Sequence, residues 1–140
     1  MTYIDTSVLV AYYCPEPLSA QAQKVLRGTT GLAISSLVET ELISALAQKV
    51  RAREMHLEAA RGVYVLFLDH LHQGAYHRLA LEQAHFAKAQ EWLVSFRVHL
   101  RTLDALHVAI AALNQATLLT ADAALAKACR NLSVATHLIS

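Results

Sequence analysis

Short apolar runs that suit buried strands alternate with longer helical segments along this 140-residue chain. The pattern predicts strands at residues 3–4, 32–35, 76–81, 118–119 and 134–136, and helices at residues 7–13, 19–27, 37–51, 55–70, 82–96, 102–115 and 123–130. Such alternation is typical of an α/β protein in which helices connect parallel strands and cover both faces of the sheet. With 55% hydrophobic residues, we expect residues 1–140 to bury one core as a single domain.

The cysteines and the N-terminus indicate where such a protein resides. Cys14 and Cys129 stand alone in apolar surroundings, with no CxxC pair and no Cys/His spacing typical of zinc. We expect both to be reduced packing residues, which fits a cytoplasmic protein better than a secreted one. The first apolar run contains Asp5, has no basic residue before it and is short, so we expect neither a signal peptide nor a membrane segment.

Four carboxylates, those of Asp5, Glu41, Asp104 and Asp122, follow a strand-like run or fall in the opening turns of a helix. In an open parallel sheet, ligands bind outside the carboxyl ends of the strands, so residues distant in sequence can converge there. Carboxylates that converge repel one another unless a cation neutralises them. Mg²⁺ or Mn²⁺ suits such a site, because these hard ions bind a few oxygens and keep several waters.

Each acid also has a simpler structural explanation. Asp5 and Asp122 each precede a helix and can act as N-caps, and Thr120 can help to cap or contact a metal-bound water. Asp104 lies near the start of a helix with Thr102 as its expected N-cap, where the helix dipole stabilises a negative charge. Capping explains each acid by itself, but the four acids together favour a metal site.

Glu39 and Glu41 are only two residues apart, yet their positions predict different roles. With Ser36 as the N-cap, Glu39 falls at the third helical position and completes a capping box, S-x-x-E. Glu41 lies beyond the first turn in the apolar segment ELISAL, where an unpaired buried carboxylate is costly. We therefore expect Glu41, and not Glu39, to contribute to the metal site.

The formal net charge of +1 gives no overall basic surface for nucleic acid, so any such binding must be local. Two basic stretches are present. Residues 49–53 are explained slightly better as a solvated helix C-terminus than as a phosphate contact. Arg97, His99 and Arg101 lead directly into Asp104, so Arg97 and Arg101 are candidate RNA contacts.

The eight histidines are scattered and lack cysteine partners, so we expect them to be surface or satisfied residues and leave them out of the site. His107 comes one turn after Asp104 and can approach the same face. Packing, or orientation of another ligand, is its expected role rather than metal binding.

Four segments, YIDTSVLVAYY, SSLVETELISAL, LRTLDALHVAIAAL and LLTADAALAKAC, together resemble the motifs of PIN-domain ribonucleases, and of VapC-type toxins in particular. The resemblance covers the chain from end to end, although residues 56–90 match only in general helical character. It implies a three-layer α/β/α sandwich around a mainly parallel central sheet. It places the family's acids at Asp5, Glu41, Asp104 and Asp122, with supporting hydroxyls at Thr6, Ser7 and Thr120.

The same resemblance implies a Mg²⁺- or Mn²⁺-dependent endoribonuclease that is usually a homodimer. A cognate VapB-like antitoxin would hold it inactive by covering the active site with a C-terminal segment. Two alternatives remain open: a non-catalytic interaction domain that keeps the fold, and a housekeeping nuclease with the same acids. An aspartyl-phosphate enzyme is disfavoured, because Thr6 and Ser7 follow Asp5 where a second Asp is usually required.

Overall fold

The computed structural model describes all residues, 1–140, and its centre is a five-stranded sheet. The strands are β1 (Thr2–Ile4), β2 (Leu32–Ser35), β3 (His77–Leu79), β4 (Thr117–Thr120) and β5 (Thr136–Leu138). Their order is β3-β2-β1-β4-β5, and every neighbouring pair is parallel. The predicted α/β class with a parallel sheet is therefore confirmed.

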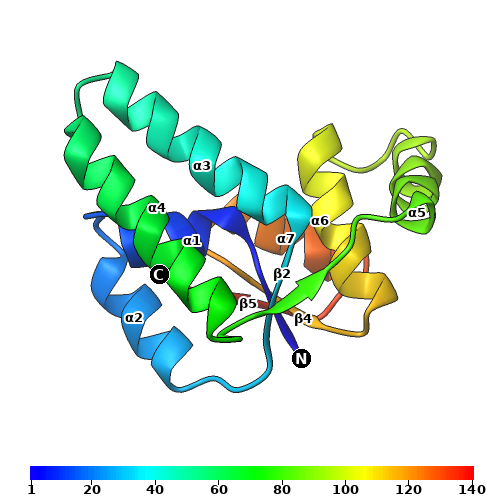
Figure 1. Ribbon diagram of the computed structural model, residues 1–140. Coiled ribbons are helices and arrows are strands. Elements are labelled where there is room, and N and C mark those ends of the chain that lie inside the picture. Colours follow the sequence, from blue (N-terminus) through cyan, green and yellow to red (C-terminus); the bar gives the residue numbers. More distant parts are fainter.

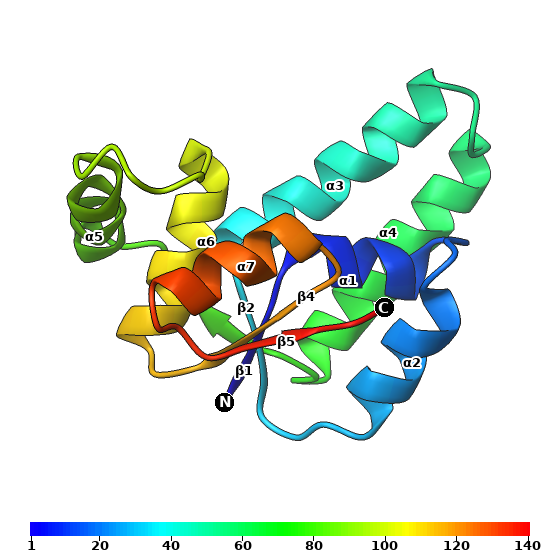
Figure 2. The same ribbon diagram turned by 180° about the vertical axis from the view of Figure 1, so that it is seen from behind.

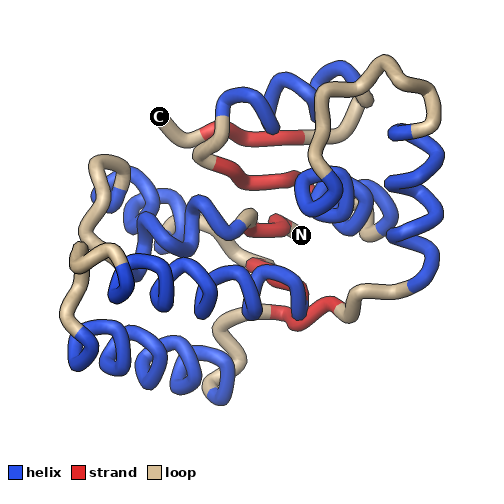
Figure 3. Tube along the Cα trace, turned by 90° about the horizontal axis from the view of Figure 1, so that it is seen from above, coloured by secondary structure: helices blue, strands red, loops and turns tan.

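Seven helices cover the sheet (Figures 1 and 3). They are α1 (Thr6–Tyr13), α2 (Ser19–Arg27), α3 (Ser36–Arg51), α4 (Leu57–His72), α5 (Gln83–Leu93), α6 (Thr102–Leu113) and α7 (Ala123–Asn131). Helices α1 to α4 lie on one side and α5 and α6 on the other, which gives the expected three layers (Figure 3). Helix α7 packs against β4 and β5 (Figure 2).

The core is centred on the middle strand β1 and its neighbour β4, whose apolar side chains are buried. Tyr3 and Ile4 of β1 and Leu118 and Leu119 of β4 are fully buried. Strands that are buried on both sides read as continuous apolar runs, which is why the sequence indicates them. Both cysteines are free and buried, as expected from their apolar surroundings. No helix is both long and apolar enough to span a bilayer.

The order of the strands reverses between β1 and β4. The chain builds β1, β2 and β3 in one direction across the sheet, then returns to place β4 on the other side of β1. Ligands bind at such a switch point in open α/β sheets, outside the carboxyl ends of the strands. Asp5 directly follows β1 and Asp122 comes two residues after β4, so both lie at this point.

The largest errors of the sequence prediction lie in β5, at the end of α5 and in α4, which covers Leu57–His72 rather than residues 55–70. Strand β5 covers Thr136–Leu138 rather than residues 134–136, because Val134 instead packs into the core from the turn before the strand. Helix α5 ends at Leu93 instead of residue 96, and Phe96 adopts a left-handed backbone with φ of 56°. That conformation cannot continue a right-handed helix.

Two predicted helix caps are wrong. Ser35, not Ser36, caps α3, and its Oγ accepts a hydrogen bond from the Val38 N–H at 3.3 Å. Glu39 forms no capping box, because its carboxylate instead binds Arg78 at 2.7 Å. Arg101, rather than Thr102, occupies the N-cap position of α6, without a side-chain cap.

Candidate active site

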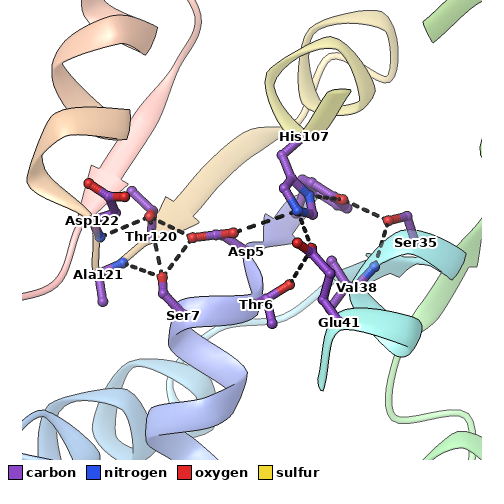
Figure 4. Close-up of polar contacts among 11 residues, drawn as sticks. Asp5, Thr6, Ser7, Ser35, Val38, Glu41, His107, Thr120, Ala121 and Asp122 are labelled. Carbon is purple, nitrogen blue, oxygen red and sulfur yellow. Dashed lines mark hydrogen bonds and ion pairs between the residues drawn. The ribbon is translucent and has the colours of Figure 1, made fainter. Parts of the chain in front are cut away.

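Asp5 is held at the end of β1 by two hydroxyl groups (Figure 4). Its Oδ2 accepts hydrogen bonds from Ser7 Oγ at 2.6 Å and from Thr120 Oγ1 at 2.8 Å. Asp5 occupies the N-cap position of α1 but makes no side-chain cap, so the capping explanation fails for this residue. Both donors bind the same oxygen, which leaves Oδ1 without a hydrogen-bond donor.

Backbone amides from the loop after β4 fix the two hydroxyls in turn (Figure 4). The N–H of Ala121 donates to Ser7 Oγ, and the N–H of Asp122 donates to Thr120 Oγ1, each at 3.0 Å. Each hydroxyl accepts a hydrogen bond from a backbone N–H and donates a hydrogen bond to Asp5. These bonds fasten the end of β1 to the end of β4.

Asp122 does cap its helix, as the simpler explanation required. Its Oδ1 accepts from the backbone N–H groups of Ala124 at 2.8 Å and Leu125 at 3.1 Å at the start of α7. No hydrogen bond engages its Oδ2. One side chain therefore both caps α7 and offers an oxygen to a ligand.

Glu41 projects from the second turn of α3 toward Asp5 and is bound through one oxygen (Figure 4). Its Oε1 accepts from Thr6 Oγ1 at 2.8 Å and lies 2.5 Å from His107 Nε2. Burial raises the pKa of the Glu41 carboxyl, but the bond and charge of His107, together with the bond from Thr6, outweigh it and lower the pKa overall. Glu41 is therefore ionised at neutral pH.

His107 is buried between the two carboxylates of Asp5 and Glu41. Its Nε2 is 3.9 Å from Asp5 Oδ1. Its Nδ1 is 2.8 Å from the Tyr3 hydroxyl, which is 2.7 Å from Ser35 Oγ. Burial lowers the pKa of His107, but the Glu41 bond and the surrounding carboxylates raise it overall. The imidazole thus connects the acids to the core.

Asp104 lies in the first turn of α6 and has no hydrogen-bond donor at either oxygen. Burial raises the pKa of its carboxyl above the ordinary value, and the charges of Asp5, Asp122 and Glu41 raise it further, against an opposing effect of His107. Asp104 therefore lies in the electrostatic field of the other three acids. The fold brings all four predicted carboxylates to one end of the sheet.

A cleft of about 950 Å³ opens over these acids. Glu41, Asp104 and Asp122 line it, and residues 98–103 form much of its wall. Arg101 lines the same cleft, whereas Arg97 lines an adjoining hollow. Neither arginine takes part in an ion pair with an acid. The cleft is open to solvent and is large enough for a nucleotide-sized ligand.

Tyr3 is a site residue that sequence reasoning missed, whereas His107 was expected to pack or to orient another ligand, and it does contact Glu41. A histidine three residues after Asp104 lies on the same helical face, which was the available signal. Its bond to Glu41 joins positions 66 residues apart, so no local pattern predicts it. His107 contacts Glu41 directly and Tyr3 contacts His107, and neither residue lines the cleft.

The donor atoms suit a hydrated hard cation. Oxygens without a hydrogen-bond donor remain on all four acids, namely Asp5 Oδ1, Glu41 Oε2, Asp122 Oδ2 and both oxygens of Asp104. No three acidic, His or Cys side chains lie close enough to enclose an ion by themselves. Mg²⁺ is commonly held by one or two carboxylates and keeps several waters, so this looser arrangement fits it.

The fold and the site together describe a parallel α/β protein with an acidic cleft at the switch point of its sheet. The chain belongs to the PIN domain family, which it matches over residues 2–131. A search of curated protein sequences gives no match.

Several solved structures share the fold despite low sequence identity. VapC20 of Mycobacterium tuberculosis, described as a Sarcin-Ricin loop cleaving toxin, is 17% identical with a TM-score of 0.72, covering 91% of this chain and 95% of that chain. FitAcB of Neisseria gonorrhoeae is 16% identical with a TM-score of 0.72, covering 97% and 96%. VapBC2 of Rickettsia felis, bound to a promoter DNA fragment, is 16% identical with a TM-score of 0.69, covering both chains fully.

Proposed function

We propose that this protein is a Mg²⁺- or Mn²⁺-dependent endoribonuclease, with residues 1–140 acting as a single catalytic domain. The observation that carries the proposal is a set of four carboxylates at one end of the sheet, three of them lining one cleft and Asp5 buried beside it, each with an oxygen that no donor engages. A purely structural role as caps does not explain Asp5 or Asp104, because neither side chain caps a helix. Membership of the PIN domain family and the resemblance to a toxin that cleaves RNA agree with this function.

In this proposal Asp5, Glu41, Asp104 and Asp122 hold the ion, and Thr6, Ser7 and Thr120 orient the first two carboxylates. A bound divalent ion polarises the scissile phosphate and supplies hydroxide at neutral pH, so no side-chain nucleophile is required. Ser7 and Thr120 aim Asp5 Oδ1 into the site by occupying its other oxygen. Arg101, on the wall of the cleft, offsets phosphate charge.

The partner is proposed to be a VapB-like antitoxin, and the protein to be a homodimer. The outer faces of α3 and α4, which project from the body as a helical hairpin (Figures 1 and 2), support a protein partner. Apolar side chains are exposed there, including Ile43, Leu57, Tyr64 and Val65. Contiguous exposed apolar surface of this kind marks protein interfaces. A similar structure from Klebsiella pneumoniae is described as a toxin-antitoxin complex.

The test is cleavage of structured RNAs, including tRNA, by the purified protein in Mg²⁺ or Mn²⁺, with EDTA as the negative condition. We expect cutting that stops in EDTA, and a fall on the order of 100-fold or more in Asp5→Asn and Asp104→Asn, the scale seen when one transition-state charge contact is lost. Glu39→Gln is the matched control, because Glu39 lies on the same helix as Glu41 but binds Arg78. Absence of metal binding together with indifference to all these substitutions would favour a non-catalytic interaction domain.

A further inference from the structure

A second hollow of about 460 Å³ adjoins the acidic cleft. The two cavities share Val98, His99 and Ala124 as lining residues, so they form one continuous groove between the loop of residues 97–101 and helix α7. The groove begins at the carboxylates and continues along α7 toward its C-terminal half. A strand that lies across the acids can therefore extend into the second hollow.

The two parts of the groove differ in charge. The first is lined by three carboxylates, whereas no acidic residue lines the second. The polar groups of the second hollow belong to Arg97, His99, Lys127 and Asn131. All of these can donate hydrogen bonds, and two of them carry a fixed positive charge.

Arg97 and Lys127 are not neutralised by the protein itself. Every ion pair of the chain involves other basic residues, and both side chains lie at the surface. Four of the twelve lysines and arginines pair with acids, as Lys49 does with Glu16 at 2.6 Å, and Arg97 and Lys127 are among the eight that do not. Two unpaired cations on opposite walls of one hollow favour an anionic ligand.

We propose that this hollow binds the nucleotide next to the scissile phosphate of a single-stranded RNA, with Lys127 and Arg97 contacting its backbone phosphate. The inference rests on the proposed ribonuclease function and adds the path of the RNA strand beyond the acids. The volume suits one nucleotide unit, and a base can enter such a hollow only when it is unstacked and unpaired. His99 and Asn131 then face the sugar or base as hydrogen-bonding groups.

Lys127→Gln and Arg97→Gln test the inference in an Asp104→Asn background, which keeps the RNA uncut. Binding of a short fluorescent single-stranded RNA is followed by anisotropy at several salt concentrations. We expect each substitution to weaken binding by about 5- to 10-fold at low salt and to reduce the slope of log affinity against log salt by about 0.7, the value for one phosphate contact on a single strand. The same RNA annealed into a duplex is expected to bind more weakly.

Arg27→Gln is the charge-matched control. Arg27 lies at the end of α2, remote from the loop between α5 and α6, and lines neither cavity (Figure 1). It is expected to leave both affinity and salt slope unchanged. In the otherwise wild-type enzyme, Lys127→Gln is expected to raise KM by a similar factor with little change in kcat, because the nucleotide contact lies outside the acidic centre.

Two outcomes overturn the inference. One is an unchanged affinity and salt slope in folded Lys127→Gln and Arg97→Gln. Another is an equal loss in Arg27→Gln, which would reduce the effect to overall charge. If the wild type cleaves RNA while these results are obtained, the ribonuclease function stands and only the nucleotide site fails. If the wild type neither binds nor cleaves RNA, both fail together.

Discussion

The hydroxyl of Thr120, at the end of β4, donates to Oδ2 of Asp5, at the end of β1, over 2.8 Å. The two residues are 115 positions apart and meet because β1 and β4 are adjacent parallel strands. The same hydroxyl accepts the N–H of Asp122 at 3.0 Å. Thr120 therefore sets the direction of one carboxylate and the backbone position of another.

Thr120→Val should lower both stability and metal affinity. The substitution keeps the shape but removes one donor from Asp5 and one acceptor from Asp122, so we expect a loss of about 1–2 kcal/mol in the free energy of unfolding. Loss of an orienting contact should weaken Mn²⁺ binding by about 10-fold. Urea denaturation and calorimetry measure the two effects. Thr117→Val, in the same strand but without a side-chain hydrogen bond, is the control, and equal effects in both variants would contradict the assignment.

Asp104→Asn should stabilise the metal-free protein at neutral pH. The pKa of Asp104 is raised in the fold, first by burial and then by Asp5, so its ionisation costs stability once the pH exceeds the ordinary value of 3.8. The penalty grows up to the raised pKa and is constant above it. Partial exposure weakens the effect, and we expect Tm in EDTA to rise by on the order of 2 °C at pH 7.

When metal is present, Asp104→Asn should instead be less stable than the wild type. A saturating divalent ion stabilises the wild type by mass action, about 2.7 kcal/mol at 100 times Kd, and should do little for Asp104→Asn. Below pH 3.8 the carboxyl is protonated in both folded and unfolded chains, so the advantage of the variant should vanish. A variant that is less stable than the wild type in EDTA at pH 7 would show that the acids do not repel one another.

His107→Leu should destabilise the protein, because Glu41 keeps its charge but loses its donor from the imidazole. We expect a loss of about 2 kcal/mol at pH 6, measured by urea denaturation in EDTA. His85→Leu is a useful comparison, since His85 is also buried but bonds to the backbone N–H of Glu82 at the start of α5.

The contribution of the His107–Glu41 pair should depend on pH in a defined window. The pKa of His107 is raised above 6.5, so its contribution is complete below 6.5 and is lost as the pH rises through the raised value. The pKa of Glu41 is lowered below 4.5, so its contribution is complete above 4.5 and is lost as the pH falls through the lowered value. The cost of His107→Leu should therefore be largest between about pH 4.5 and 6.5. A cost that rises from pH 6 to pH 9 would contradict the pair.

Sequence patterns predicted the parts of the site that depend on the residues immediately before and after each acid. Asp5 and Asp122 each come after a buried apolar run and before a helix, which fixes their place at the end of a parallel sheet. The preference for Glu41 over Glu39 came from helical position, and the structure directs Glu39 outward to Arg78. The supporting hydroxyls followed from the resemblance, and each contacts one of the four acids.

The contacts that the sequence could not predict depend on tertiary packing. His107 reaches Glu41 only because α6 and α3, on opposite sides of the sheet, both bring a side chain to its carboxyl end, and Tyr3 reaches His107 across 104 positions. The N-cap of α3 could not be chosen from the sequence, because two adjacent serines can each serve as an N-cap. The structure uses Ser35 rather than Ser36. Lys127 lies within the segment LLTADAALAKAC, but no role was expected for it there, and only the groove beside α7 gives it one.

The most direct test of the central claim is calorimetric titration of the metal-free protein with Mn²⁺. If the four carboxylates form one metal site, the wild type and Glu39→Gln should bind with the same affinity, while Asp104→Asn and Asp5→Asn should lose binding by about 10-fold or more. Equal binding by all four proteins, or no binding by the folded wild type, would contradict a metal site at the ends of β1 and β4.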